Sequence, residues 1–266
     1  MIINACAGQR SNRIIVIAHG IASALRRREN LRITEMADLE PDYQCVFPIV
    51  AGSGLDCVHV DLRPSRFWAI ERCLHVYAQR ILHVRFQIPG VVSDWTYRDY
   101  EGVEEFRQQI VSFFTPREER IAEAEKLYSE LSSDGKKRIL IGVHVRRGDY
   151  ALWRGGRYCF DDSVYVRSMR SLSGELTAND SRFLVTCIVF SNESLDLNNF
   201  KCGECEVRIS KGNPLEDHYL MSKCDYLFGP PSTFTRWAAY MGRKPLAYIE
   251  DSNQTLSLSD FKYMSI

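Results

Sequence analysis

Apolar and polar positions change along the chain in blocks that predict strands and helices by turns. Short runs rich in Val and Ile are typical of buried strands, and longer stretches with apolar residues three or four apart are typical of helices. In the second half we predict strands at 138–145, 183–190, 206–209, 226–228 and 245–249, and helices at 161–172, 215–224 and 234–241. This alternation favours a parallel α/β sheet.

The first half shows the same alternation, with a less regular middle. Strands are predicted at 2–6 and 31–33, with a long helix at 14–28 between them. Further along we predict helices at 67–81, 101–114 and 117–131 and a strand within 82–95. The turn sequence Ser132–Gly135 separates two α/β halves. We therefore predict one domain at 1–133 and a second at 134–266.

Charge and composition restrict the classes of partner. The 266 residues carry 34 basic and 34 acidic side chains, so a net charge of +0 gives no reason to expect nucleic acid as a partner. The sequence contains no run of about 20 apolar residues, so we predict no transmembrane segment. The first residues lack the pattern of a secretory signal. Nine cysteines, most of them in apolar surroundings, are typical of reduced thiols, so we expect a cytoplasmic protein.

The single C-x-x-C motif, Cys202–Cys205, is a weak candidate for a metal site. A structural zinc site needs a second ligand pair at suitable spacing. His218 and Cys224 follow at a spacing that fits no standard site. We therefore expect no metal at this motif.

The segment His144–Tyr150, with the sequence His-Val-Arg-Arg-Gly-Asp-Tyr, directly follows the apolar stretch Ile139–Val143 of the predicted strand. Ligands of open α/β sheets bind beside the carboxyl ends of strands. Arg146 and Arg147 leave this strand end together, and two planar guanidinium groups suit a polyanion such as a diphosphate. The alternative interpretation is a solvated basic turn without a ligand.

A second candidate follows the strand at 226–228. Pro230 and Pro231 form a rigid turn, and Ser232 and Thr233 then open a helix. Backbone N–H groups and hydroxyls at such a helix start suit a phosphate. Simple capping of the helix explains these two residues equally well.

Two further segments carry polar groups at helix starts. Glu216 and Asp217 lie in the first turn of the helix at 215–224, where the helix dipole stabilises carboxylates. One of them could instead accept hydrogen bonds from the N1–H and exocyclic amine of guanine, an amine that uracil lacks. In the turn Gly8–Arg13, Asn12 could contact a ligand or cap the following helix.

Several of these segments resemble motifs of the α-1,2-fucosyltransferases, glycosyltransferase family 11. His144–Tyr150 matches their His-x-Arg-Arg-Gly-Asp-Tyr signature, to which signatures of the α-1,6- and protein O-fucosyltransferases are related. Pro230–Tyr240 retains Ser-Thr-Phe and one Trp of an Asn-Ser-Thr-Phe-Ser-Trp-Trp-type motif. Pro214–Cys224 is similar to Glu-Asp-x-x-Leu-Leu-Ser-x-Cys.

Two weaker matches complete the resemblance. Ser191–Glu193 resembles a Phe-Ser-Asp-Asp-type segment that could meet the nucleotide, although a turn explains it equally well. Gly8–Arg13 aligns with Gly-x-x-Gly-Asn, but the second glycine is Ser11 here. A close backbone approach to a ligand at Ser11 would therefore be altered.

The resemblance implies a GT-B-like α/β fold, with two Rossmann-like halves facing a central cleft. The N-terminal half would hold the acceptor, and the C-terminal half would bind the nucleotide-sugar donor. The implied reaction is inverting transfer of L-fucose from GDP-fucose to a hydroxyl of an oligosaccharide or glycan, with an α-1,2 linkage. A different nucleotide sugar, or non-catalytic nucleotide or glycan binding, are the alternatives. Peripheral attachment to a membrane where glycans are assembled is compatible with a cytoplasmic enzyme.

The same resemblance assigns roles to individual residues. Arg146 would be catalytic by stabilising the departing GDP. Asp149 would either take the proton of the acceptor hydroxyl or orient the arginines, and we favour the orienting role. His144 would contact the donor or be a packed core histidine. The complete set of predicted donor-binding residues is Asn12, His144, Arg146, Arg147, Asp217, Ser232, Thr233 and Phe234. No Asp-x-Asp triplet occurs in the sequence, in agreement with arginines in place of a metal and with no cofactor besides the donor substrate.

Overall fold

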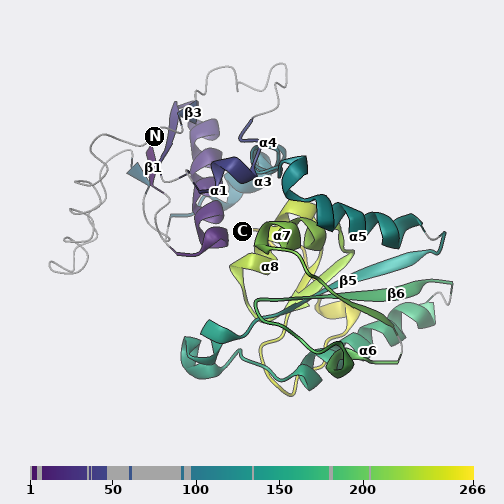
Figure 1. Cartoon of the computed structure of the whole chain (residues 1–266). Coiled ribbons are helices and arrows are strands. Elements are labelled where there is room, and N and C mark those ends of the chain that lie inside the picture. The colour runs from purple at the N-terminus through teal and green to yellow at the C-terminus, as the bar shows by residue number, and fades with distance from the viewer. Residues whose placement is uncertain are drawn as a thin grey trace. The chain divides into compact units, whose positions relative to one another are not determined.

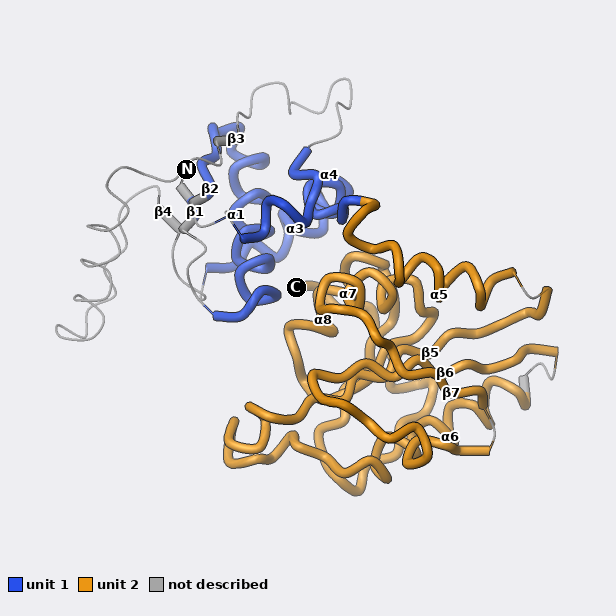
Figure 2. The backbone as a smooth tube through the Cα atoms, in the orientation of Figure 1, with its two compact units in different colours: residues 1–117 blue, residues 118–266 orange. Residues whose placement is uncertain are grey.

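The computed structural model describes residues 2–4, 8–34, 36, 38–46, 60–61, 91–92, 97–133, 135–179, 182–203 and 205–266. The chain divides into two compact units, Met1–Arg117 and Glu118–Ile266, coloured separately in Figure 2. Each unit contains a parallel sheet of its own. The predicted helix at 67–81 and most of the predicted strand within 82–95 lie outside the described residues.

The second unit is built on five parallel strands in the order β7-β6-β5-β8-β9. Figure 1 labels β5 and β6 of this sheet. The strands are β5 (Arg138–Val145), β6 (Leu184–Ser191), β7 (Glu206–Ile209), β8 (Tyr226–Gly229) and β9 (Leu246–Tyr248). Every predicted strand of this half is confirmed to within about two residues. The match follows from burial, because a strand covered on both faces shows a nearly continuous apolar run.

Helices cover both faces of this sheet. Helix α6 (Asp162–Asn179) contributes Val164, Met169 and Leu172 to the core cluster on one face. The other face packs against α5 (Ala122–Ser133), α7 (Pro214–Lys223) and α8 (Thr233–Gly242). Helix α6 is longer than predicted, since Leu176 continues its buried face one turn beyond Leu172.

The strand order places a switch point between β5 and β8. From β5 the chain adds β6 and β7 on one side, and it then returns to add β8 and β9 on the other side. Ligands of doubly wound folds bind at this position, outside the carboxyl ends of the two strands. The segments after β5 and β8 are the two that the sequence singled out.

Helix α5 explains where the two units divide. The division at Arg117 and Glu118 lies before α5, whereas the sequence placed a boundary after it, at 133 and 134. The helix packs on α7: the Tyr219 hydroxyl donates a hydrogen bond to the Glu125 carboxylate, and the Lys223 ammonium lies 5.8 Å from the Tyr128 ring centroid. These contacts attach α5 to the second unit.

The first unit has a four-stranded parallel sheet in the order β3-β2-β1-β4. Its strands are β1 (Ile2–Asn4), β2 (Leu31–Thr34), β3 (Val60–Asp61) and β4 (Val91–Val92). The buried face of helix α1 (Arg10–Arg27) includes Ile14, Ile17, Ala18 and Ile21. The single helix predicted at 101–114 is two helices, α3 (Tyr100–Glu105) and α4 (Arg107–Phe113), which meet at Phe106.

Helix α1 begins earlier than predicted and ends within one residue of the predicted end. The helix begins at Arg10, with Gln9 in the capping position, so Asn12 lies inside the first turn and the cap interpretation of Asn12 is wrong. At the other end, Arg26 forms ion pairs with three acidic side chains near α3, at 3.3 Å from Asp99, 3.1 Å from Glu101 and 3.8 Å from Glu105. None of the helices in the described part of the chain has the length and apolarity needed to cross a membrane.

Candidate functional site at the β5 and β8 strand ends

His144 connects the two candidate motifs of the second unit. Its ring is 3% exposed, and its Nδ1 atom lies 2.8 Å from the Oγ1 atom of Thr235 in α8. The ring also stacks on Phe234, with 5.1 Å between centroids. Burial, with a smaller contribution from Arg146, lowers the pKa of His144 to about 3, so the imidazole is neutral near neutral pH. The structure therefore has His144 as a packed histidine, and a contact with a donor stays a prediction.

Arg146 is the first side chain beyond the end of β5. Its guanidinium pairs with the Asp149 carboxylate at 2.9 Å and lies 5.6 Å from the ring centroid of Tyr150. The side chain of Arg146 is 15% exposed, whereas that of Asp149 is 49% exposed. The ion pair matches the orienting arrangement favoured for Asp149, because it holds the guanidinium in one position while leaving the carboxylate accessible.

Arg147 has a different environment from Arg146. Its guanidinium forms an ion pair with Asp162 at the start of α6. Its backbone N–H donates to Asn192 Oδ1 at 3.0 Å, and its carbonyl accepts from Asn192 Nδ2 at 3.1 Å. The two neighbouring arginines are thus held by separate groups of residues.

The turn after β8 lies beside this segment. Tyr150 donates a hydrogen bond from its hydroxyl to the carbonyl of Pro231 at 2.7 Å, which ties the signature loop to the Pro-Pro turn. Ser232 is the N-cap of α8, and its hydroxyl accepts from the N–H of Phe234 at 3.1 Å. The capping interpretation of Ser232 is therefore confirmed. Thr233 is the first residue of the helix.

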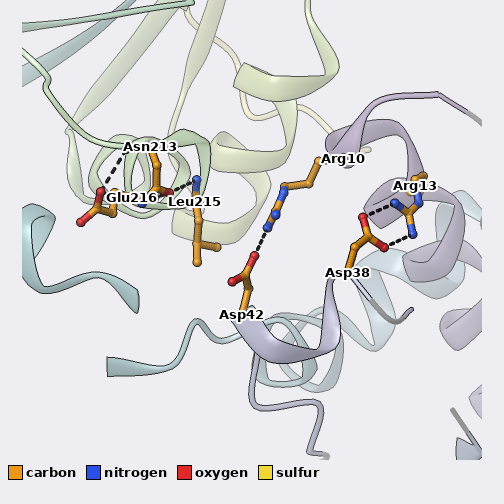
Figure 3. Close-up of polar contacts among 7 residues, drawn as sticks. All are labelled: Arg10, Arg13, Asp38, Asp42, Asn213, Leu215 and Glu216. Atoms are coloured by element: carbon orange, nitrogen blue, oxygen red, sulfur yellow. Dashed lines mark hydrogen bonds and ion pairs between the residues drawn. The ribbon is translucent and has the colours of Figure 1, made fainter. Parts of the chain in front are cut away.

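Glu216 and Asp217 lie next to each other in α7 but have different surroundings. Glu216 belongs to a capping box, in which its carboxylate accepts from the N–H of Asn213 at 3.0 Å and Asn213 Oδ1 accepts from the N–H of Glu216 at 3.2 Å. Asn213 Oδ1 also accepts from the N–H of Leu215 at 2.9 Å (Figure 3). This arrangement gives Glu216 a structural role. Asp217 is 7% exposed and accepts a hydrogen bond from the Ser210 hydroxyl. Burial raises the pKa of Asp217 to about 7.

A cavity of about 400 Å³ lies between α5, α7 and the end of β7, and Asp217 is not one of its lining residues. Ser210 and Gly212 line it, and a Cβ atom added to Gly212 would lie 3.0 Å from Asp217 Oδ1. Basic and acidic side chains share its wall, among them Lys126, Arg208 and Glu123.

Two arginines in the first turn of α1, Arg10 and Arg13, form ion pairs with carboxylates of the same unit. Arg10 contacts Asp42 at 2.6 Å, and Arg13 contacts both oxygens of Asp38, at 2.6 and 2.8 Å (Figure 3). These ion pairs fix the start of α1. Gly8, with a φ of +82°, approaches Asn12 so closely that an added Cβ would lie 2.7 Å from its Nδ2 atom.

The cysteines of the C-x-x-C motif have thiol neighbours in the second unit. Cys205 Sγ lies 3.5 Å from Cys187 Sγ, and the described cysteines are all free thiols. Among the residues for which coordinates are described, no group of three or more His, Cys, Asp or Glu side chains is arranged to hold a metal ion.

Sequence reasoning missed three residues of this site. Asp162 and Thr235 hold Arg147 and His144, and Tyr150 joins the two motifs. Asn192 was included in the segment Ser191–Glu193, predicted either to meet the nucleotide or to form a turn, but its contact with Arg147 was not foreseen. Each of these contacts joins residues that are separated along the chain, so local sequence patterns could not predict them.

Comparison with known proteins gives consistent relatives. Galactoside alpha-(1,2)-fucosyltransferase 2 from Gorilla gorilla gorilla is 27% identical over 235 residues, which cover 84% of this chain and 62% of the relative. The enzyme of the same name from Mus musculus is 28% identical over 202 residues, covering 73% of this chain and 53% of the relative. The chain thus spans less than two thirds of the length of these relatives.

Solved structures share the fold. A NodZ alpha-1,6-fucosyltransferase soaked with GDP-fucose superposes with a TM-score of 0.60 and 17% identity, covering 100% of this chain and 98% of the other. A mutant of Arabidopsis thaliana FUT1 in complex with GDP gives a TM-score of 0.61 and 14% identity, covering 98% of this chain and 72% of the other. The predicted α/β fold of GT-B-like type is confirmed by this likeness. The family model described as glycosyl transferase family 11 matches residues 79–263, more than half of the sequence, and the chain therefore belongs to glycosyl transferase family 11.

Proposed function

We propose that this protein transfers L-fucose from GDP-fucose to a hydroxyl group of a glycan, and that it forms an α-1,2 linkage. One observation carries the proposal: Arg146 leaves β5 beside the Ser232–Phe234 turn after β8, at the switch point of a parallel sheet. Family membership supports a glycosyl transfer reaction. The names of the relatives support fucose as the sugar and the α-1,2 linkage.

The leaving group of this reaction is GDP. As the bond between the sugar's anomeric carbon and the β-phosphate oxygen breaks, the electron pair goes to GDP and positive charge develops on the sugar ring. The guanidinium of Arg146 can donate two hydrogen bonds to the phosphate, and the pairing with Asp149 fixes its orientation in advance. Preorganised donors of this kind contribute about 3–4 kcal/mol to transition-state stabilisation. The arginine would neutralise GDP without a metal ion.

The acceptor hydroxyl attacks the anomeric carbon from the opposite face and loses its proton. Asp149 is accessible enough to take this proton, yet its carboxylate is already engaged in an ion pair with Arg146. We therefore assign Asp149 an orienting role and expect the proton to go to another group or to solvent.

Asp217 is the candidate for recognition of guanine. An ionised carboxylate can accept from both the N1–H and the exocyclic amine of the base, and Ser210, the hydrogen-bond partner of Asp217, lines the cavity between α5, α7 and β7. The Ser210 hydroxyl, which donates to Asp217, orients the carboxylate. This pairing supports GDP over UDP as the nucleotide of the donor.

Two other activities are compatible with a GT-B-like fold. A different linkage is one, because solved structures of similar fold include an α-1,6-fucosyltransferase and POFUT1 in complex with GDP-fucose. Non-catalytic nucleotide or glycan binding is the other. The relatives' names favour the α-1,2 linkage over both.

The first test is calorimetric binding of GDP and GDP-fucose in the presence of EDTA. We expect the wild type to bind both ligands and Arg146→Ala to lose most of this affinity. Arg157→Ala is a matched control, because Arg157 is an exposed arginine of the same basic loop. If both variants lose affinity equally, general positive charge rather than a specific arginine site explains binding.

The second test is transfer to a galactoside, with the product linkage read by NMR. Formation of an α-1,2-linked fucose, with turnover reduced about 100- to 1,000-fold in Arg146→Ala, supports the proposal. An α-1,6 product would correct the linkage. GDP binding without transfer or donor hydrolysis would establish a binding protein instead, and no binding of either ligand would reject the donor.

A further inference from the structure

Asn192 holds both backbone groups of Arg147. The residue directly follows β6, and its side-chain amide accepts from the Arg147 N–H at 3.0 Å and donates to the Arg147 carbonyl at 3.1 Å. The paired bonds resemble one rung of a sheet, made by a side chain in place of a backbone. They extend the contact between β5 and β6 beyond the last backbone pair, Val145 with Ser191, by two residues on the β5 side and one on the β6 side.

This arrangement requires an amide side chain. Asparagine offers one acceptor and one pair of donors, whereas an ionised aspartate can only accept. An aspartate at this position would keep the bond to the N–H of Arg147 but would place a carboxylate oxygen against the Arg147 carbonyl. The two oxygens would repel each other, and the turn would shift.

Gly148 is adapted to the same contact. Its φ of +62° is in the left-handed region that favours glycine, and a Cβ atom there would lie 3.1 Å from Asn192 Nδ2. The turn after Arg147 therefore follows a path that brings the backbone close to the Asn192 amide. A side chain at residue 148 would push the amide away.

A second group of contacts holds the side chain of Arg147. Its guanidinium pairs with Asp162, and Asp162 also accepts a hydrogen bond from Asn199 Nδ2 at 3.0 Å. Backbone and side chain of Arg147 are thus fixed from β6, α6 and the short 3-10 helix Leu197–Phe200. Arg146, the preceding residue, forms its ion pair with Asp149, which lies in the next 3-10 helix, Gly148–Ala151.

We infer that Asn192 is a positioning residue for the arginine pair: it fixes the peptide groups of Arg147 and thereby the direction in which Arg146 presents its guanidinium to the diphosphate. This inference rests on the proposed function for the identity of the ligand. It separates the two arginines, with Arg147 anchored in the protein and Arg146 next to it as the phosphate contact.

The test compares GDP binding of the wild type with Asn192→Asp and Asn192→Ala. Asn192→Asp preserves the shape of the side chain and removes the donor, while Asn192→Ala removes both bonds without adding charge. We expect both variants to weaken GDP binding by on the order of 10- to 100-fold, as for other displaced reactive groups. Asn253→Asp is the matched control, because Asn253 is exposed in the turn after β9, and it should bind GDP like the wild type.

A double-mutant comparison distinguishes positioning from general loss of structure. If Asn192 acts through Arg146, Asn192→Ala should have almost no further effect on GDP binding once Arg146→Ala is present. An effect of full size in that background would overturn the inference. So would wild-type affinity in both Asn192 variants.

Hydrogen exchange gives a readout that does not depend on GDP. The amide of Arg147 should exchange faster in Asn192→Ala than in the wild type, with the β5 amides unchanged. An unchanged exchange rate of the Arg147 amide would show that Asn192 does not hold this backbone, even if GDP binds. Absence of GDP binding to the wild type would instead reject the proposed function, while the exchange result would still decide whether Asn192 holds this turn.

Discussion

The Nδ1 atom of His144 and the Oγ1 atom of Thr235 lie 2.8 Å apart, and both residues are buried. This hydrogen bond joins the end of β5, which leads into the arginine pair, to the first turn of α8. The two predicted motifs are therefore coupled through the protein interior as well as by their position at one edge of the sheet. A substitution at Thr235 should therefore alter the structure of both motifs.

We predict that Thr235→Val destabilises the protein by about 1–3 kcal/mol, because the buried ring nitrogen of His144 loses its partner. Urea unfolding measures the difference. Thr177→Val is the control: the Thr177 hydroxyl bonds only carbonyls of its own helix, at 2.8 Å from Ser173 and 3.2 Å from Gly174. Equal losses in the two variants would show that the His144 contact adds nothing special.

Gly229 provides a second prediction about the same strand pair. A Cβ atom there would lie 2.5 Å from the carbonyl oxygen of His144, so β8 can approach β5 only with glycine at this position. We predict that Gly229→Ala costs about 2–3 kcal/mol through overpacking and weakens GDP binding, since the strand ends are forced apart.

Gly174→Ala is the matched control for Gly229→Ala. Gly174 lies within α6, and a Cβ atom there would meet no atom within 4 Å. Alanine is the better helix former, so Gly174→Ala should stabilise the protein by up to about 1 kcal/mol. Thermal unfolding of the two variants should therefore shift in opposite directions, and a stabilised Gly229→Ala would contradict the close strand approach.

The strands of the second unit could be predicted because strands buried on both faces have nearly continuous apolar sequences. Helix ends were less certain: α1 begins at Arg10, before its apolar face starts at Ile14, since the polar first turn is held by ion pairs to Asp38 and Asp42. Local pattern carries no signal for such pairs. Their partners lie 25 and 32 residues further along the chain.

The candidate site shows the same difference between features that local sequence predicts and contacts between distant residues. The positions of Arg146 and Ser232 just beyond strand ends could be predicted, because each belongs to a short motif after a recognisable strand. The partner of Arg147 is 45 residues away at Asn192, and that of His144 is 91 residues away at Thr235. Only the folded sheet brings these pairs together, so the sequence could suggest candidate ligand groups but could not say which of them the protein itself already holds.

Asp217 leads to a prediction about pH. Its pKa is raised by burial to about 7, above the value of about 3.9 of an unfolded aspartate, so the folded state retains a proton that the unfolded state loses. Stability from this group is present at low pH and is lost as pH rises from about 4 to 7. Asp217→Asn should therefore stabilise the protein by roughly 2–4 kcal/mol at about pH 8 and have little effect at about pH 4.

His144 acts in the opposite direction over part of the same range. Its pKa is lowered to about 3, below the value of about 6.5 in the unfolded chain, so stability from this group falls as pH drops from about 6.5 to 3. The two slopes offset each other in the wild type. Removing Asp217 should expose the histidine slope of about 1.4 kcal/mol per pH unit, and urea unfolding of Asp217→Asn at several pH values would measure it. A flat profile in the variant would contradict the neutral, buried state of His144.

Substitution of Asp149 tests whether this residue orients Arg146 or accepts the proton of the acceptor hydroxyl. Its carboxylate pairs with Arg146 at 2.9 Å, so we predict that Asp149→Asn raises the KM for GDP-fucose and lowers turnover about 10- to 100-fold, because the guanidinium loses its fixed direction. The pH dependence of the remaining turnover should keep its shape, since an orienting residue supplies no ionisation to the reaction. Asp161→Asn, a change to an exposed carboxylate before α6, is the control and should leave both constants unchanged. Loss of the ascending limb of the pH profile in Asp149→Asn alone would instead identify Asp149 as the base that accepts the acceptor's proton.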